Sequence, residues 1–303
     1  AVPVTEAAFA AQRARLGKPM QVGNEGGGVV VAAVSSPADQ ALRGNTVGFL
    51  SVNEYAKYRS LHVSQCLPRA DGTDPADAAA AFVNPLTALG MVETMRAEGH
   101  TALVHTVGAS NLGLMLNRIC IDDGVGLVNI VRKPEHVELL RSLGATHVVD
   151  SSAESFIDDL TDALRATGAT IAFDAIGGGD LASILLSRMV KVAGEQAGEF
   201  SRFGSDTHKQ VYIYGGLDRG PTTLRRDFGM SWGLGGWLLT PFLIKIGQEA
   251  ADRLRQRVAD EITTTFASTY GTRLSLADAV DPGQVARYAR MATGDKALVT
   301  PHA

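Results

Sequence analysis

The stretch Ala102–Gly113, with the sequence ALVHTVGASNLG, decides the fold of this chain. Its first half, Ala102–Thr106, is short, apolar and β-prone, which is typical of a buried strand. A turn of small residues follows over Val107–Asn111, and apolar residues then recur at helical spacing as far as Cys120. A strand, such a turn and a helix together predict a phosphate site. The free N–H groups at the helix start point toward the ligand, and the helix dipole favours negative charge.

The turn departs from the ideal three-glycine fingerprint in one place. Ser110 stands where the middle glycine is expected, between Gly108 and Gly113. A tight strand-to-helix turn without any ligand is therefore an alternative interpretation. The next apolar run, Val125–Val131, indicates a second parallel strand directly after the helix.

The residues after this second strand bear on the choice of dinucleotide. The NAD version of such a unit carries an acidic residue there, which holds the ribose hydroxyls. This chain has Arg132 and Lys133 instead, and two cations suit a 2′-phosphate. Two solvated surface charges are the alternative, but together with the glycine turn the pair favours NADPH as the cofactor.

Composition narrows the class of protein. The net charge is −4 and there is no basic run, so nucleic-acid binding is not expected. No apolar run approaches the roughly 18–20 residues of a membrane span, and no signal peptide is recognisable. The two cysteines, Cys66 and Cys120, form no disulfide framework and no four-cysteine zinc lobe. We expect a soluble cytoplasmic protein, and the absence of an initial Met suggests that upstream residues are missing.

The first part of the chain has the pattern of a small β-domain. An Ala-rich segment, Thr5–Leu16, is compatible with a helix, and short strands are expected at Val29–Val34, Thr46–Leu50 and Lys57–Val63. A domain boundary is expected at the end of the polar, turn-rich segment Asp71–Asp77.

From there on, helices alternate with strands, which predicts a doubly wound parallel sheet. Helices are expected at Asp77–Arg96 with an interruption at Asn84-Pro85, between Pro134 and Gly144, at Glu154–Thr167, after Asp180 and at Ala250–Phe266. Further strands are expected at His147–Val149, Thr170–Phe173 and Lys209–Tyr214. The end of the chain is expected to form helices at Ser275–Val280 and Gln284–Met291 and a closing strand at Lys296–Thr300.

Several motifs taken together resemble the zinc-independent branch of the medium-chain dehydrogenase/reductase superfamily. They are GNEGGGVV (Gly23–Val30), AFVNPLTALGMV (Ala81–Val92), LVNIVRKPE (Leu127–Glu135), LGATHVVD (Leu143–Asp150), IAFDAIGGG (Ile171–Gly179) and YGG (Tyr214–Gly216). Within that branch the chain is most similar to quinone oxidoreductase-like proteins and mitochondrial-type enoyl thioester reductases.

The resemblance implies an α/β fold in which a Rossmann doubly wound parallel sheet accompanies a GroES-like, partly open β-barrel domain. It assigns 1–77 and 270–303 to the GroES-like catalytic domain, incomplete at its N-terminus, and 78–269 to the Rossmann NADP-binding domain. It also implies a homodimer formed through the edge of the Rossmann sheet, with Gln210–Tyr214 nearby.

The residues themselves argue against a metal. Zinc-dependent relatives carry Gly-His-Glu where this chain has Gly23-Asn24-Glu25, and an asparagine amide is a poor zinc ligand. We therefore predict no metal. An unusual site built from Glu25, Cys66 or His62 is the alternative.

The resemblance also carries over cofactor contacts, residue by residue. At the nicotinamide end they are Asn84 and Thr87, flanked by Tyr214, Gly215, Gly216 and Leu217 and by Gly236, Trp237, Leu238 and Leu239. At the pyrophosphate they are Ala109, Ser110, Asn111, Leu112 and Gly113, with Arg132 and Lys133 at the 2′-phosphate and Lys296 reaching the cofactor from the closing strand. Core packing is the alternative for Trp237, and a solvated surface position is the alternative for Lys296.

The proton donor stays unassigned. In the enoyl reductases it is a tyrosine upstream of the Gly-Asn-Glu motif, but this chain has no tyrosine before Tyr55. The leading hypothesis is an NADPH-dependent enzyme that transfers hydride, without zinc, to a small electrophilic substrate, a quinone or an α,β-unsaturated carbonyl or enoyl compound. The alternatives are a non-catalytic NADPH-binding protein, acting as a redox sensor or structural protein, and a Rossmann-type methyltransferase. The methyltransferase is disfavoured because Arg132 stands where an acid should hold the ribose.

Overall fold

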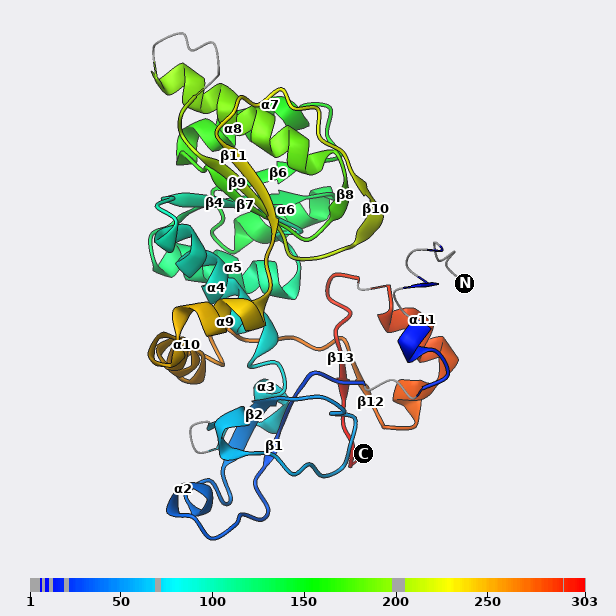
Figure 1. Cartoon of the computed structure of the whole chain (residues 1–303). Coiled ribbons are helices and arrows are strands. Elements are labelled where there is room, and N and C mark those ends of the chain that lie inside the picture. The colour runs from blue at the N-terminus through cyan, green and yellow to red at the C-terminus, as the bar shows by residue number, and fades with distance from the viewer. Residues whose placement is uncertain are drawn as a thin grey trace.

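The computed structural model describes residues 6, 9–10, 13–18, 22–68, 72–197, 205–290 and 292–302. Figure 1 shows a large sheet wrapped by helices, with a small sheet beyond one side of it and the C-terminal elements beside both. Of the helix expected at Thr5–Leu16, Thr5, Ala7, Ala8, Ala11 and Gln12 lie outside the described residues. The described Glu6, Phe9 and Ala10 are helical, and the short 3-10 helix η1 (Arg13–Arg15) follows.

The large sheet has six strands, all parallel, in the order β11-β9-β7-β4-β5-β6. Read in chain order, the first strand of this sheet, β4, lies in the middle and the order reverses between β4 and β7. This is the arrangement of a Rossmann fold, and ligands of such sheets bind at that reversal. The strands are β4 (Ala102–Thr106), β5 (Gly126–Val131), β6 (His147–Asp150), β7 (Ile171–Asp174), β9 (Lys209–Ile213) and β11 (Trp232–Gly236).

Helices cover both faces of the large sheet, as the alternating pattern predicted (Figure 1). One hydrophobic core joins the sheet to α4 (Val83–Ala97), α5 (Asn111–Asp122), α9 (Leu239–Ile246) and α10 (Gln248–Asp260). A second core on the opposite face contains α7 (Phe156–Thr167) and α8 (Leu181–Ala197). Beside β6, α6 (Pro134–Ser142) buries Leu140. The expected doubly wound α/β architecture is therefore confirmed.

Strand β11 is absent from the sequence-based prediction, because glycines interrupt its apolar run and resemble loop punctuation. It pairs with β9 from Trp232–Lys209 to Gly236–Ile213 and forms one edge of the sheet. Two of its glycines lie against β9 side chains, since a Cβ on Gly233 would meet Gln210 Oε1 at 2.1 Å. Gln210–Tyr214, expected near the sheet edge, belongs largely to β9, the strand next to the edge strand β11.

A separate two-stranded sheet follows the carboxyl ends of β7 and β9. β8 (Gly177–Gly179) follows β7 and pairs in parallel with β10 (Asp218–Thr222), which follows β9. All five residues of β10 are exposed. The sequence indicated only glycine-rich loops in this region.

The small sheet is antiparallel, with β2 (Thr46–Leu50) between β1 (Glu25–Val29) and β3 (Cys66–Pro68). The strand expected at Val29–Val34 lies earlier, in the glycine run itself. The glycines let α3 (Pro75–Ala78) lie directly on the strand, because a Cβ on Gly27 would be 2.4 Å from the Pro75 carbonyl oxygen. A short helix, α2 (Pro37–Gln40), lies in the β1–β2 connection.

Three other boundary predictions are wrong. No strand forms at Lys57–Val63, and β2 pairs instead with β3, which follows the 3-10 helix η2 (Val63–Gln65). The helix break lies before Val83 rather than at Asn84-Pro85, because Pro85 occupies the first turn of α4, where its missing N–H has no intrahelical partner to lose. The helix expected at Ala250–Phe266 ends at Asp260 and continues as turns.

The C-terminal elements return to the small sheet. They are β12 (Thr272–Leu274), η3 (Asp278–Val280), α11 (Pro282–Tyr288) and β13 (Ala297–Val299), with β12 and β13 paired in parallel. The Tyr270 hydroxyl donates to the Ala76 carbonyl oxygen at 2.8 Å, and His302 Nε2 lies 3.1 Å from the Lys57 carbonyl oxygen. The region expected to be a partly open barrel thus consists of the small sheet and this second strand pair.

Among the described residues, no helix is both long enough and apolar enough to cross a bilayer.

Candidate dinucleotide site

The turn between β4 and α5 is shaped by two glycines in close contact. A Cβ on Gly113 would lie 2.2 Å from the carbonyl oxygen of Gly108, so the helix start lies directly against the strand end. Ser110 explains the missing middle glycine, because it is the N-cap and its hydroxyl accepts the Gly113 N–H at 3.1 Å. The N–H groups of Asn111 and Leu112 donate to no described residue. They are available to an anion at the positive end of the helix dipole.

The turn is also fixed to the neighbouring strand β5. The Gly108 N–H donates to the Ile130 carbonyl oxygen at 2.9 Å, and a Cβ on Gly108 would lie 2.8 Å from Asn129 Oδ1. Asn129 is fully buried and donates to Asn117 Oδ1, while its own Oδ1 has no partner among the described residues. A buried acceptor is thus left unpaired beside the predicted phosphate turn.

Arg132 and Lys133 lie just past the end of β5, one strand away from the turn, and both are exposed. Lys133 makes a long ion pair with Glu135, 3.5 Å between Nζ and Oε1. Arg132 has no hydrogen-bond or ion-pair partner within the described ranges. No such partner therefore competes there with a phosphate for its guanidinium, and the 2′-phosphate role stays a prediction.

Thr106 and Asp174 fix the crevice where the strand order reverses, at the ends of β4 and β7. The Thr106 hydroxyl donates to Asp174 Oδ1 at 3.0 Å and accepts the Ala175 N–H at 2.8 Å. The buried Asp174 carboxylate also accepts the N–H groups of Ile176 and Gly177, at 2.9 and 3.1 Å. These hydrogen bonds therefore restrict the conformation of the loop that follows β7.

Tyr214 follows β9 and pairs with a histidine that the sequence analysis did not single out. Its hydroxyl lies 2.7 Å from Nε2 of His105, and the two rings stack with centroids 5.8 Å apart. His105 is completely buried in β4, and this burial lowers its pKa to about 3. Burial also raises the pKa of Tyr214 above its ordinary value. The position of His105 inside an otherwise apolar strand was the signal that could have identified it.

The next two predicted residues, Gly215 and Gly216, pass close to the β7 exit. A Cβ on Gly215 would lie 2.6 Å from the Ala175 carbonyl oxygen, and the Leu217 N–H donates to that same oxygen at 3.1 Å. Leu217 itself is exposed. This glycine is therefore required for the close approach of two strand exits at the crevice.

Trp237 is packed into the core, as the alternative interpretation of the sequence held. Its indole N–H donates to the Thr94 hydroxyl of α4 at 3.0 Å, and the ring contacts Phe173 edge-on and packs against Phe242. Leu238, the next residue, is 65% exposed, whereas Leu239 is buried. Of this predicted segment, Leu238 is the side chain open to a ligand.

The first turns of α4 carry Asn84 and Thr87, the former half-buried and the latter buried. Glu25 of β1 lies at this helix start, and Lys296, which precedes β13, interacts electrostatically with Glu25. Lys296 is largely buried and its Nζ has no hydrogen-bond partner in the described part of the chain, so the solvated alternative for this residue is wrong. Glu25 entered the sequence analysis only as a remnant of a zinc motif.

The residues of the alternative zinc site have other partners. Glu25 accepts the N–H groups of Phe82 and Val83, and His62 caps η2 through its ring nitrogen. The described residues contain no group of three or more potential metal ligands.

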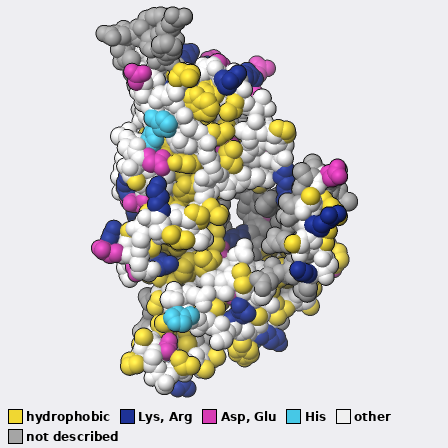
Figure 2. All heavy atoms as spheres, in the orientation of Figure 1, with side chains coloured by type: hydrophobic (Ala, Val, Ile, Leu, Met, Phe, Trp, Pro, Cys, Tyr) yellow, Lys and Arg dark blue, Asp and Glu magenta, His cyan; other side chains and the backbone are white. Residues whose placement is uncertain are grey.

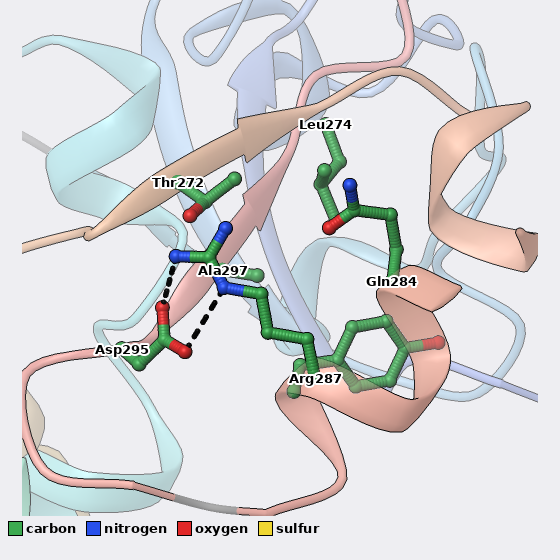
Figure 3. A pocket seen from close by; sticks show the side chains of 7 residues that line it. Thr272, Leu274, Gln284, Arg287, Asp295 and Ala297 are labelled. Atoms are coloured by element: carbon green, nitrogen blue, oxygen red, sulfur yellow. Dashed lines mark hydrogen bonds and ion pairs between the residues drawn. The ribbon is translucent and has the colours of Figure 1, made fainter. Parts of the chain in front are cut away.

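Two cavities lie away from the strand-end crevice. One, of about 10 Å³, lies between β12, β13 and α11 and has the Arg287–Asp295 ion pair in its wall (Figure 3), so it holds about one water. The other, of about 220 Å³, lies at the amino ends of β4 and β7 against α8 and contains His100. Figure 2 shows a hollow in the surface at another place than these two cavities, between the large sheet and the C-terminal elements.

The carboxyl ends of the strands carry groups of the kind that bind a phosphorylated dinucleotide. Glycines stand where a Cβ would collide with backbone at Gly113 and Gly215, free N–H groups start α5, and an unpaired guanidinium lies at the next strand end. These are the donors that bind phosphate oxygens.

Comparison with solved structures places the chain among reductases in fold. A putative NADPH:quinone reductase from Mesorhizobium loti matches with a TM-score of 0.74 and 26% identity, over 92% of this chain and 77% of that one. The Escherichia coli quinone oxidoreductase complexed with NADPH matches with a TM-score of 0.69 and 17% identity, over 97% and 86%. A mutant enoyl thioester reductase from Candida tropicalis matches with a TM-score of 0.68 and 18% identity, over 98% and 88%.

These matches confirm the resemblance to the zinc-independent medium-chain dehydrogenases/reductases that the motifs indicated. No protein-family model and no curated protein matches the sequence itself.

Proposed function

We propose that this protein is an NADPH-dependent oxidoreductase that reduces a quinone or an α,β-unsaturated carbonyl or enoyl compound without zinc. The observation that carries the proposal is the free helix start at Asn111 and Leu112, one strand away from the unpaired Arg132 guanidinium. The two sites would take the pyrophosphate and the 2′-phosphate of one dinucleotide. The likeness to reductases described as NADPH-dependent or complexed with NADPH supports the choice of cofactor.

Each part of the crevice has a defined task in this proposal. The α5 start and Arg132 bind the phosphates, while Gly215 and Leu217 shape the wall beside the reacting end. Asn84 and Thr87, in the first turns of α4, would lie at the nicotinamide end. Bound NADPH would supply a hydride to an electron-poor carbon of the acceptor. The protein contributes orientation and a dry cleft.

The class of acceptor is inferred from the groups that would surround it and the charge that forms on it during the reaction. Reduction of a conjugated carbonyl or quinone places negative charge on oxygen, which hydrogen-bond donors stabilise in the absence of a metal. The exposed apolar Leu217 and Leu238 at the crevice suit a planar, largely apolar acceptor.

The direct test is stopped-flow absorbance at the NADPH band with a quinone series and an enoyl thioester series as acceptors. Oxidation of NADPH by one of the series, with saturation in the acceptor, is the expected result. The absence of turnover with both, by a protein that binds NADPH, would contradict the enzymatic proposal. Parallel assays with NADH measure the contribution of the 2′-phosphate.

A second candidate is NADPH binding without catalysis. It is favoured by one observation, that the Tyr214 hydroxyl is already hydrogen-bonded to the buried His105. This candidate predicts measurable NADPH affinity and no hydride transfer to any acceptor of either series.

We further propose a homodimer, formed through the β11 edge rather than through β9, in a reducing cytoplasmic compartment. The support is the unpaired edge of β11 and the two free thiols, Cys66 and Cys120. Light scattering of a Leu234→Pro variant tests the edge, because proline removes a ladder donor from β11. A monomer is the expected result, and an unchanged dimer would place the interface elsewhere.

A further inference from the structure

Glu25 ties the small sheet to the start of α4. Its Oε2 accepts the Val83 N–H at 2.8 Å and the Phe82 N–H at 3.3 Å. The N-cap residue Phe82 offers no side-chain hydrogen bond, so the carboxylate from β1 replaces a local cap. The other oxygen, Oε1, accepts no hydrogen bond from a described residue, which leaves half of this carboxylate uncommitted.

Lys296 approaches the same place from the opposite end of the chain. Its Nζ is buried, lies 5.6 Å from the ring centroid of Tyr270 and has no hydrogen-bond acceptor in the described part of the protein. The charges of Lys296 and Glu25 are close enough to interact, although they form no ion pair. A buried ammonium without a partner is costly, so the structure must offset this cost.

We propose that Glu25 is a positioning residue that keeps Lys296 charged and directed toward the start of α4, where the ammonium binds an oxygen of the dinucleotide. Glu25 does this with Oε1, while Oε2 holds the helix. The role of Lys296 as a ligand rests on the proposed function, whereas the action of Glu25 on Lys296 is a property of the protein alone.

The groups around Glu25 and Lys296 determine in which direction the pKa of Lys296 changes when the Glu25 charge is removed. Burial lowers the pKa of Lys296 and the Glu25 charge raises it, while burial raises the pKa of Glu25 and the Lys296 charge lowers it. Tyr270 also faces the pair, but its hydroxyl donates to Ala76, and burial keeps it neutral by raising its pKa. Asp74, Asp77 and Arg273 act electrostatically on Tyr270 from beyond it. Removal of the Glu25 charge therefore makes Lys296 lose its proton at a lower pH.

The first experiment measures this without any cofactor. Glu25→Gln removes the charge but keeps an oxygen that can accept the N–H of Val83. NMR of protein labelled with ¹³C at the lysine Cε, with the Lys296 signal assigned by its loss in Lys296→Met, gives the titration midpoint of this buried amine. The midpoint is expected at lower pH in Glu25→Gln than in the wild type. The control is Asp281→Asn, because Asp281 also accepts two helix N–H groups, those of Gly283 and Gln284. An unchanged midpoint in Glu25→Gln would overturn the proposal.

The second experiment measures NADPH dissociation constants by fluorescence titration. Lys296→Met is expected to weaken binding about tenfold, the loss of one charge-assisted hydrogen bond. Glu25→Gln is expected to weaken it by less, and the double variant should match Lys296→Met. Additive losses would show that Glu25 acts only through α4 and would overturn the coupling. If the wild type does not bind NADPH, the proposed function fails, and the NMR titration of Lys296 still decides the role of Glu25.

Should Glu25→Gln not fold, Lys296→Met tests the coupling from the other side. Loss of the ammonium should raise the pKa of Glu25, so the infrared band of its protonated carboxyl group should persist to higher pH. A band that is unchanged by Lys296→Met would contradict the coupling.

Discussion

The hydroxyl of Tyr214 lies 2.7 Å from Nε2 of His105, and this bond joins β4 to the residue after β9 across the intervening β7. Both side chains belong to the sheet face that α4 and α5 cover. The other ring nitrogen of His105 has no partner in the described structure. The imidazole is therefore buried in its neutral form, with one of its two nitrogens satisfied.

Acid should destabilise the protein through His105. Burial lowers the folded pKa of His105 to about 3, whereas the unfolded value is about 6.5. Below pH 6.5 His105 is protonated in the unfolded chain but stays neutral in the folded chain. The free energy of unfolding therefore falls as the pH falls toward 3. The slope from this group is about 1.4 kcal/mol per pH unit. Urea unfolding at pH 7 and pH 5 should show a smaller loss for His105→Gln than for the wild type. His136→Gln, on α6, is the matched histidine control, and equal losses in His105→Gln and wild type would contradict this assignment.

Arg132→Ala should separate the two dinucleotides. Removal of a charge-assisted hydrogen bond costs about 1.5–3 kcal/mol, so NADPH affinity should fall by roughly 10- to 150-fold, while NADH affinity should hardly change. Calorimetric titration with both dinucleotides measures the difference. Arg141→Ala, on the neighbouring helix α6, is a control for the general loss of positive charge. Equal losses for NADPH and NADH would mean that Arg132 is not at the 2′-phosphate.

Gly113→Ala should disrupt the turn itself. The added Cβ would lie 2.2 Å from the Gly108 carbonyl oxygen, and the three nearest atoms are all backbone atoms of Gly108, so no side chain can move aside. We expect an overpacking cost of at least about 1–3 kcal/mol in unfolding free energy, together with loss of NADPH binding. Gly194→Ala is the control, because that position in α8 is open and alanine should stabilise the helix by up to about 1 kcal/mol. Wild-type affinity in Gly113→Ala would remove the turn from the proposed phosphate site.

The two thiols should differ in reactivity. Burial raises the pKa of Cys120 to about 12, and Cys66 is half-buried with a smaller rise of its pKa from the same cause. Since the thiolate is the reactive form, Cys120 should stay unmodified in the native protein and react only on unfolding. Alkylation followed by peptide mass spectrometry, with and without denaturant, checks this. Native labelling of Cys120 ahead of Cys66 would contradict the burial described here.

The strands in the sheet interior were predictable because a continuous apolar run has one physical cause, burial of the strand on both faces. Apolar runs such as Ala102–Thr106 are buried on both faces, so strand and helix alternation indicated the Rossmann arrangement directly. The turn between β4 and α5 was predictable as well, because small residues at Gly108 and Gly113 permit the close contact that a tight strand-to-helix turn needs. The structure adds the reason for Ser110, which caps the helix that a glycine would leave uncapped.

Glycine-rich segments were the main source of error. At β1 and β11 the glycines were interpreted as turns, but they permit close packing, of α3 on Gly27 and of Gln210 on Gly233. Glycine is common both where the chain reverses and where two segments pack closely. Only the residues that lie next to the glycine in the folded protein distinguish the two cases. Lys296, His105 and Glu25 show the same limit for polar residues, because their burial depends on segments far away in sequence.

The placement of Lys296 has a consequence for the order in which the protein is made. A ribosome releases the whole large sheet, from β4 to β11, before it releases the segment that carries Lys296 and β13. The nucleotide crevice can therefore assemble during translation while the ammonium that reaches toward Glu25 is still inside the exit tunnel. A nascent chain stalled before Lys296 would isolate that earlier state.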